Sequence, residues 1–142
     1  MSRLIPIALA LLTTSLPALA QNPVDTQPGM WEYRLETKMP GMAVPPQTFQ
    51  RCLTAQDVAQ HKHLIGEKSD KNPCTISNFK AGGGKLSFDF MCKSAQTTMK
   101  GVTSGSATAT SLDLETRMHM VPAPQGMGEM MQKMQAKRIG NC

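Results

Sequence analysis

The segment Met30-Trp31-Glu32-Tyr33-Arg34-Leu35-Glu36-Thr37-Lys38-Met39 contains the clearest structural signal in this chain. From Trp31 onward, charged side chains occupy every even position, and apolar side chains or threonine occupy every odd position. A repeat of two residues is that of a β-strand with one buried face and one exposed face. The segment therefore predicts a strand whose Trp31, Tyr33 and Leu35 side chains face a core.

Further strands are expected between the glycine and proline breaks in the rest of the chain. The three glycines Gly82-Gly83-Gly84 allow the positive φ angles of a tight reversal and predict a hairpin. Gly101 and Gly105 interrupt a later, weakly apolar strand and are expected to form bulges or bends. The strands are expected at 48–53, 74–80, 85–92, 97–109 and 112–120.

Two segments differ from this alternating pattern. Thr54 can cap a helix by accepting a hydrogen bond from a free backbone N–H group, which predicts a short helical turn after it. Residues 61–73, which begin with His61-Lys62-His63, are interpreted as a polar loop.

The segment that follows Pro124 is compatible with a helix or a strand. From Met130 to Ala136, every second residue fits the alternation of a strand, but helical spacing also relates Met127, Met130, Met131 and Met134. A strand is favoured because it would cover an exposed edge of a sheet that already has six strands.

The chain is therefore predicted to be all-β, an antiparallel meander of about seven strands that forms a curved sheet or a small barrel. Such a sheet has a concave apolar face, and the mouths of barrels are common sites for small ligands. The side chains expected on the concave face are Trp31, Tyr33, Leu35, Phe88, Phe90, Leu114, Met118 and Met120.

The first 20 residues have the three parts of a secretory signal peptide. Arg3 supplies a positive start, residues 4–16 form an apolar run, and Ala18-Leu19-Ala20 is a small-residue cleavage site. The apolar run is shorter than the roughly 20 residues that a membrane-spanning helix needs. Cleavage is expected after Ala20, which leaves residues 21–142 as one exported domain without stable membrane insertion.

The four cysteines predict two disulfides, because their even number and wide spacing fit an exported protein better than a zinc site. One pairing joins Cys52 to Cys74 and Cys92 to Cys142, and it bridges the polar loop between two strands expected to be neighbours. The rival joins Cys74 to Cys92, which are equidistant from Gly83, and Cys52 to Cys142. The first pairing is favoured because disulfides fit directly paired strands poorly.

Charge and motifs argue against two classes of function. The net charge of +5 comes from scattered basic residues rather than from a basic face with aromatic side chains, so nucleic-acid binding is not expected. Two histidines lie in the polar loop, and His119 lies on the outer side of a strand. The chain has no Gly-x-Ser-x-Gly or His-Glu-x-x-His motif, and we expect neither enzymatic activity nor a cofactor.

Methionine is the most unusual feature of the composition, with twelve methionines against one tryptophan, one tyrosine and four phenylalanines. Methionine can fill irregular gaps in a core or line a ligand pocket. Outside the cytoplasm, clustered thioethers can instead hold Cu(I) or Ag(I), and exposed ones can react with oxidants. The candidate soft-metal ligands are Met118, Met120, Met127, Met130, Met131 and Met134, and a second candidate metal pair is His61 with His63.

Four segments carry a resemblance to a known family. They are Pro28-Gly29-Met30-Trp31-Glu32, Met39-Pro40-Gly41-Met42, Gln50-Arg51-Cys52-Leu53-Thr54 and Lys137-Arg138-Ile139-Gly140-Asn141-Cys142. In this order, together with Cys74, Cys92 and Met118-His119-Met120, they resemble the secreted bacterial family catalogued as domain of unknown function 3617 (DUF3617). The resemblance implies an exported, periplasmic protein of Gram-negative bacteria and favours a strand at the C-terminus. It supplies no catalytic residue, substrate or cofactor.

These observations predict an exported, periplasmic β protein without catalytic activity. Its expected role is to bind a small apolar ligand or a component of the cell envelope. The alternative is a methionine-based Cu(I) or Ag(I) binding protein.

Overall fold

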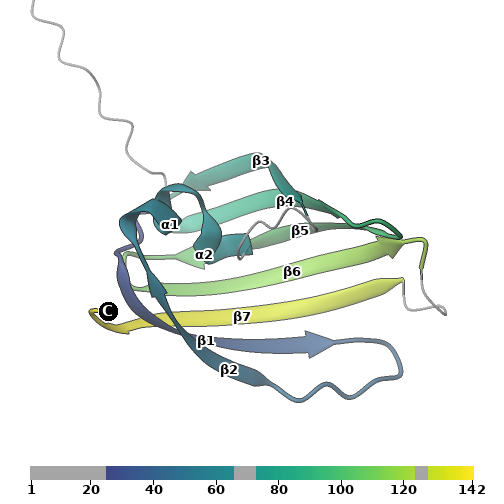
Figure 1. Cartoon of the computed structure of the whole chain (residues 1–142), viewed down its shortest axis with the longest axis horizontal. Coiled ribbons are helices and arrows are strands. Elements are labelled where there is room, and N and C mark those ends of the chain that lie inside the picture. The colour runs from purple at the N-terminus through teal and green to yellow at the C-terminus, as the bar shows by residue number, and fades with distance from the viewer. Residues whose placement is uncertain (1–24, 66–72, 124–127) are drawn as a thin grey trace, which may run out of the picture.

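Seven antiparallel strands form a single sheet in the computed structural model, which describes residues 25–65, 73–123 and 128–142 (Figure 1). The expected secretory signal at residues 1–20 and the candidate ligand Met127 lie outside the described residues. The strands are β1 Gly29–Lys38, β2 Gln47–Leu53, β3 Cys74–Gly82, β4 Lys85–Lys93, β5 Thr98–Ala107, β6 Ser111–Val121 and β7 Glu129–Gly140. The all-β prediction is confirmed, and each expected strand overlaps an observed one.

The last strand occupies the middle of the sheet rather than an edge. The strand order is β2-β1-β7-β6-β5-β4-β3, so β7 lies between β1 and β6 (Figure 1). The prediction of a strand for the final segment is confirmed, and this strand covers a free edge of β6 and a free edge of β1. The long strand β1 pairs with β2 on one side and needs a second partner for its other hydrogen-bonding edge, which β7 supplies. Because β2 and β3 are the two edges, the sheet is open, and a continuous meander runs only from β3 to β7.

Two short helices follow β2. Helix α1, Ala55–Ala59, begins at the expected N-cap. The Asp57 backbone N–H donates to the Thr54 hydroxyl at 3.1 Å, and the Thr54 backbone N–H donates to the Asp57 carboxylate at 3.0 Å. Helix α2, Lys62–Ile65, corrects the expected polar loop: its His63 and Leu64 are buried. Four residues are too few to create a helical repeat in the sequence, so only packing against the sheet distinguishes this segment from a loop.

The hydrophobic core lies on the concave face of the sheet. The largest fully buried side chains are Trp31, Leu53, Phe88 and Leu114. The eight residues expected on this face fall into two groups. Four are buried, namely Trp31, Tyr33, Phe88 and Leu114, and four are half-buried, namely Leu35, Phe90, Met118 and Met120. The alternation of the sequence therefore identified the inward face of each strand.

Gly101 and Gly105 do not form the expected bulges, because the register of β5 with both β4 and β6 is unbroken. These glycines instead allow close packing on the concave face. A Cβ atom at Gly101 would lie 2.6 Å from a ring carbon of Phe90, and one at Gly105 would overlap the carbonyl oxygen of Asp113. Glycine at position 101 thus leaves space that the Phe90 ring occupies.

The two disulfides join Cys52 to Cys142 and Cys74 to Cys92, so the favoured sequence-based pairing is wrong and the rival pairing is present. Cys52 and Cys74 cannot meet, because β2 and β3 are opposite edges of the sheet rather than neighbours. Cys74 lies directly opposite Cys92 in the β3–β4 register. Cys74 is the first residue of β3, so this disulfide joins the two strands at the end of their ladder.

The two ends of the described domain meet beside Trp31. The Trp31 indole N–H donates to the Gln27 carbonyl at 2.9 Å, and the Arg138 Nε–H donates to the Pro28 carbonyl at 2.8 Å. Arg138 also donates through Nη2 to Oδ1 of Asn141 at 2.6 Å. Residues 28–32 and 137–142 therefore form one structural junction at this end of the sheet.

Candidate functional site

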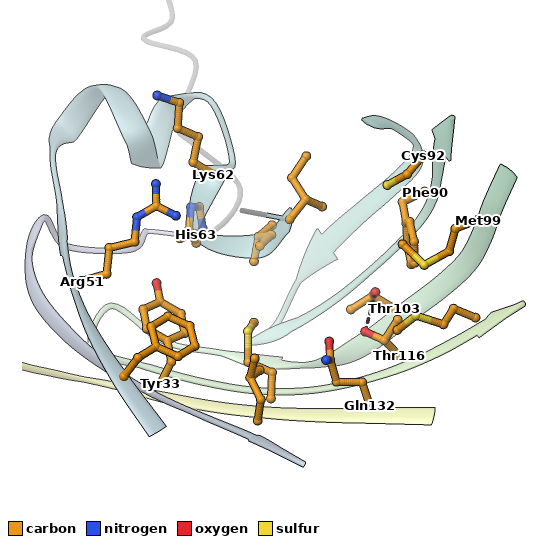
Figure 2. Close-up of a pocket in the computed structure, with 16 residues that line it drawn as sticks. Tyr33, Arg51, Lys62, His63, Phe90, Cys92, Met99, Thr103, Thr116 and Gln132 are labelled. Carbon is orange, nitrogen blue, oxygen red and sulfur yellow. Dashed lines mark hydrogen bonds between the residues drawn. The ribbon is translucent and has the colours of Figure 1, made fainter. Parts of the chain in front are cut away.

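A cavity of about 280 Å³ lies between the concave face of the sheet and helix α2 (Figure 2). Residues of β1, β2, β4, β5, β6 and β7 line it together with residues 62–65. Its volume is near the lower end of the range for sites that bind small organic molecules. The curvature of the sheet creates this space, because α2 covers the concave face without filling it.

The cavity has a polar end and an apolar end. Tyr33 of β1 and Arg51 of β2 lie at one side, on the same side as His63 of α2 (Figure 2). Phe90 and Met99 lie at the opposite side (Figure 2). The lining also includes the apolar side chains of Leu35, Met118 and Met134.

Tyr33 places a hydroxyl at the polar end with no hydrogen-bond partner among residues 25–65, 73–123 and 128–142. The residue is only 3% exposed, and its ring stacks on Phe49 with a centroid distance of 5.1 Å. Burial raises the pKa of Tyr33 to about 12, although the positive charge of Arg51 acts in the opposite direction. Tyr33 therefore remains protonated at neutral pH and can donate a hydrogen bond.

His63 is buried at the polar end rather than solvated in a loop, which corrects the sequence-based interpretation. It is 3% exposed, and its Nε2 lies 3.5 Å from Oγ1 of Thr26. Burial, reinforced by the neighbouring His61, lowers the pKa of His63 to about 4, so the ring is neutral at pH 7. Its partner in the candidate metal pair, His61, stacks on Phe79 at a centroid distance of 5.0 Å. In the described parts of the chain, no cluster of three or more His, Cys, Asp or Glu residues could hold a metal ion.

The buried His63 predicts a loss of stability in weak acid. Its folded-state pKa of about 4 lies below the 6.5 of an unperturbed histidine, so protons bind preferentially to the unfolded chain. The contribution of neutral His63 is complete above about pH 6.5 and is lost as the pH falls through 4, with an upper limit of about 3 kcal/mol. Urea unfolding from pH 7 to pH 4 measures this slope, and His63→Leu should flatten it. The control His119→Gln changes an exposed residue on the outer face of β6 and should not. An unchanged slope in His63→Leu would contradict the assignment.

The middle of the cavity contains polar groups that already have partners. The hydroxyls of Thr103 and Thr116 are hydrogen-bonded to each other at 2.8 Å, and Gln132 donates to the Thr37 hydroxyl at 3.4 Å. The Lys62 ammonium forms an ion pair with Asp57 at 3.0 Å, and in Figure 2 it points away from the cavity. The Tyr33 hydroxyl and Nδ1 of His63 are thus the buried polar groups of the lining that have no hydrogen-bond partner among the described residues.

The candidate methionine ligands are divided between the two faces of the sheet. Met118, Met120, Met130 and Met134 are half-buried on the concave side, whereas Met131 is 36% exposed on the other side. The strand register places Met99 opposite Met120 and Met118 opposite Met130. Met130, Met131 and Met134 therefore do not share a helical face. Met118, Met120, Met130 and Met134 share the concave face of the sheet instead.

A family model described as "Protein of unknown function (DUF3617)" matches residues 26–142. This chain belongs to the DUF3617 family. The match covers all seven strands and both helices, so the resemblance noted in the sequence is confirmed. No curated protein and no solved structure matches the chain. Within the described ranges of this DUF3617 protein, no helix is long and apolar enough to cross a membrane.

Most of the segments that carry the DUF3617 resemblance have structural roles. Trp31 is buried, Cys52 forms a disulfide, Leu53 is in the core and Thr54 caps α1. Arg51 belongs to the same segment, but its side chain lines the cavity. Sequence reasoning did not select Arg51, although a charged residue at an inward position of a strand is a signal that could have done so.

Proposed function

We propose that this DUF3617 protein is an exported, periplasmic binding protein without catalytic activity, which holds a small, mainly apolar molecule in the cavity under α2. The observation that carries this proposal is a cavity with apolar walls and one buried hydroxyl that lacks a partner among the described residues. Apolar lining with a few placed polar groups is typical of small-molecule sites. A buried hydroxyl without a partner is costly for folding alone, and a ligand would satisfy it.

The location and the absence of catalysis have separate support. Two disulfides are typical of an oxidising compartment outside the cytoplasm. A hydrolytic site needs a base held near a nucleophile, whereas His63 is buried beside Thr26 and His119 is on the outer face of β6. The disulfides therefore support a location outside the cytoplasm, and the positions of the two histidines favour a binding role over an enzymatic one.

Binding of the neutral fluorescent probe N-phenyl-1-naphthylamine tests the proposal. Met118→Trp and Leu35→Trp add bulk inside the cavity and are expected to weaken probe affinity at least about tenfold, because the cavity is small. The matched control Met131→Trp makes a similar substitution on the opposite face and should leave the affinity unchanged. Equal affinity in all variants, or no binding by the parent protein, would overturn the proposal.

A second candidate function is Cu(I) or Ag(I) binding, favoured by the two opposed methionine pairs on the concave face. Thioether sulfur is a soft ligand that suits these ions. A competition titration with Cu(I) separates the two functions. Loss of Cu(I) affinity in Met118→Leu with Met130→Leu, but not in Met131→Leu, would support the metal site. Equal Cu(I) affinity in all these proteins, or none in the parent, would exclude it.

A further inference from the structure

We propose that the ligand of the cavity is an alkyl carboxylate, with its carboxylate beside Tyr33 and Arg51 and its alkyl chain directed towards Phe90 and Met99. This inference rests on the proposed binding function and names the chemical class of the ligand. It is derived from the charges, the hydrogen-bonding groups and the polarity of the cavity walls.

The polar end favours an anion over a cation. Arg51 and Lys62 are the ionised residues in the lining, and no Asp or Glu is present among the described lining residues. The charge of Lys62 is compensated by its ion pair with Asp57, and His63 is neutral at pH 7. Arg51 lines the same end, and its positive charge opposes the rise in the pKa of the Tyr33 hydroxyl.

The number of donors fits a carboxylate. The Tyr33 hydroxyl can donate one hydrogen bond to one carboxylate oxygen, and the positive field of Arg51 stabilises the charge that both oxygens share. Hydrogen bonds to an ionised acceptor are stronger than those between neutral groups. Nδ1 of His63 also has no partner among the described residues, and in the tautomer that carries a proton there it can donate to the second carboxylate oxygen. A phosphate would bring more charge and three terminal oxygens to these two groups.

The rest of the cavity fits an alkyl chain. Leu35 lies opposite Met134 in the β1–β7 register, and Phe90 and Met118 both lie opposite Gly101, so apolar side chains extend across the concave face from β1 to β4. The hydroxyls of Thr103 and Thr116 in the lining are hydrogen-bonded to each other. Methionine side chains adapt to flexible apolar ligands because they are unbranched and polarizable. At roughly 30 Å³ for each water-sized group, the 280 Å³ cavity holds about nine such groups. Octanoate therefore matches the space better than the long-chain acids of membranes.

Displacement of N-phenyl-1-naphthylamine by octanoate, 1-octanol and octylamine tests this inference, since the three differ only in the head group. Octanoate is expected to displace the probe at a concentration about tenfold lower than 1-octanol, and octylamine should be the weakest. Tyr33→Phe and Arg51→Gln should each reduce the preference for octanoate over 1-octanol to near one. Arg34→Gln makes the same change in charge on the outer face of β1, where the Arg34 side chain is 54% exposed, and should preserve the preference.

The outcomes separate the two proposals. Equal displacement by octanoate and 1-octanol, or no displacement by any of the three, would overturn the carboxylate inference while leaving the binding function intact, whereas failure of the parent protein to bind the probe would contradict both. A preference that persists in both Tyr33→Phe and Arg51→Gln would also overturn the inference. Tyr33→Phe should fold normally, because it removes a single hydroxyl that makes no hydrogen bond to the described residues. Its melting temperature without ligand is expected to equal or exceed that of the parent protein.

Discussion

Replacement of Cys52 and Cys142 by serine is expected to lower the free energy of unfolding by roughly 4.5 kcal/mol, given a separation of 90 residues. The same change at Cys74 and Cys92, which are 18 residues apart, should cost about 3 kcal/mol. The physical reason is that a disulfide that closes a longer loop removes more conformations from the unfolded chain. The disulfide of the longer loop also links the two strands that pair with β1, since Cys52 lies in β2 and Cys142 lies just beyond β7.

Urea unfolding of the two double variants, followed by circular dichroism in the oxidised parent and in each variant, measures this difference. The double variant at Cys74 and Cys92 is the matched control, since it also removes one disulfide and adds two hydroxyls. A larger loss in that control than in the variant at Cys52 and Cys142 would contradict the prediction. Such a result would mean that the local connection of β3 to β4 is the more important one.

Gly29→Ala is expected to cost at least about 3 kcal/mol, from strain at a backbone conformation reserved for glycine and from steric overlap. Gly29 has a φ of +141°, and a Cβ atom there would overlap the carbonyl oxygen of Gly140. The Cβ atom would also lie 2.6 Å from Nε of Arg138, which donates to the Pro28 carbonyl. The substitution therefore disturbs the junction between the first strand and the C-terminal segment.

Gly82→Ala is the control for this prediction, because it also changes glycine to alanine in a strand. Gly82 does not have a positive φ, and a Cβ atom there would meet no described atom within 4 Å. Its effect on the free energy of unfolding should stay within about 0.5 kcal/mol. Near-ultraviolet circular dichroism of Trp31 reports on the junction if Gly29→Ala is too unstable for a complete unfolding curve. Equal stability of the two variants would show that the close approach at Gly29 has no energetic importance.

The sequence by itself determined the strands and the direction of their side chains. Alternation in a strand is a local property, because successive side chains point to opposite faces whatever the strand pairs with. For this reason Trp31, Tyr33, Phe88 and Leu114 could be placed on the buried face, and Thr54 could be identified as a helix cap. The periodicity of 127–136 left helix and strand both open, and the strand was favoured because it would cover a free edge of the sheet; β7 is the observed strand.

Only the tertiary structure decided which strands are neighbours and what lies between them. Pairing depends on hydrogen bonds between segments far apart in the chain, and nothing local in 129–140 specifies β1 as its partner. The disulfide prediction failed for that reason, because it assumed that β2 and β3 were adjacent. The cavity depends on the same long-range arrangement: Arg51 and His63 reach it from an edge strand and a four-residue helix, and sheet curvature brings them over Tyr33.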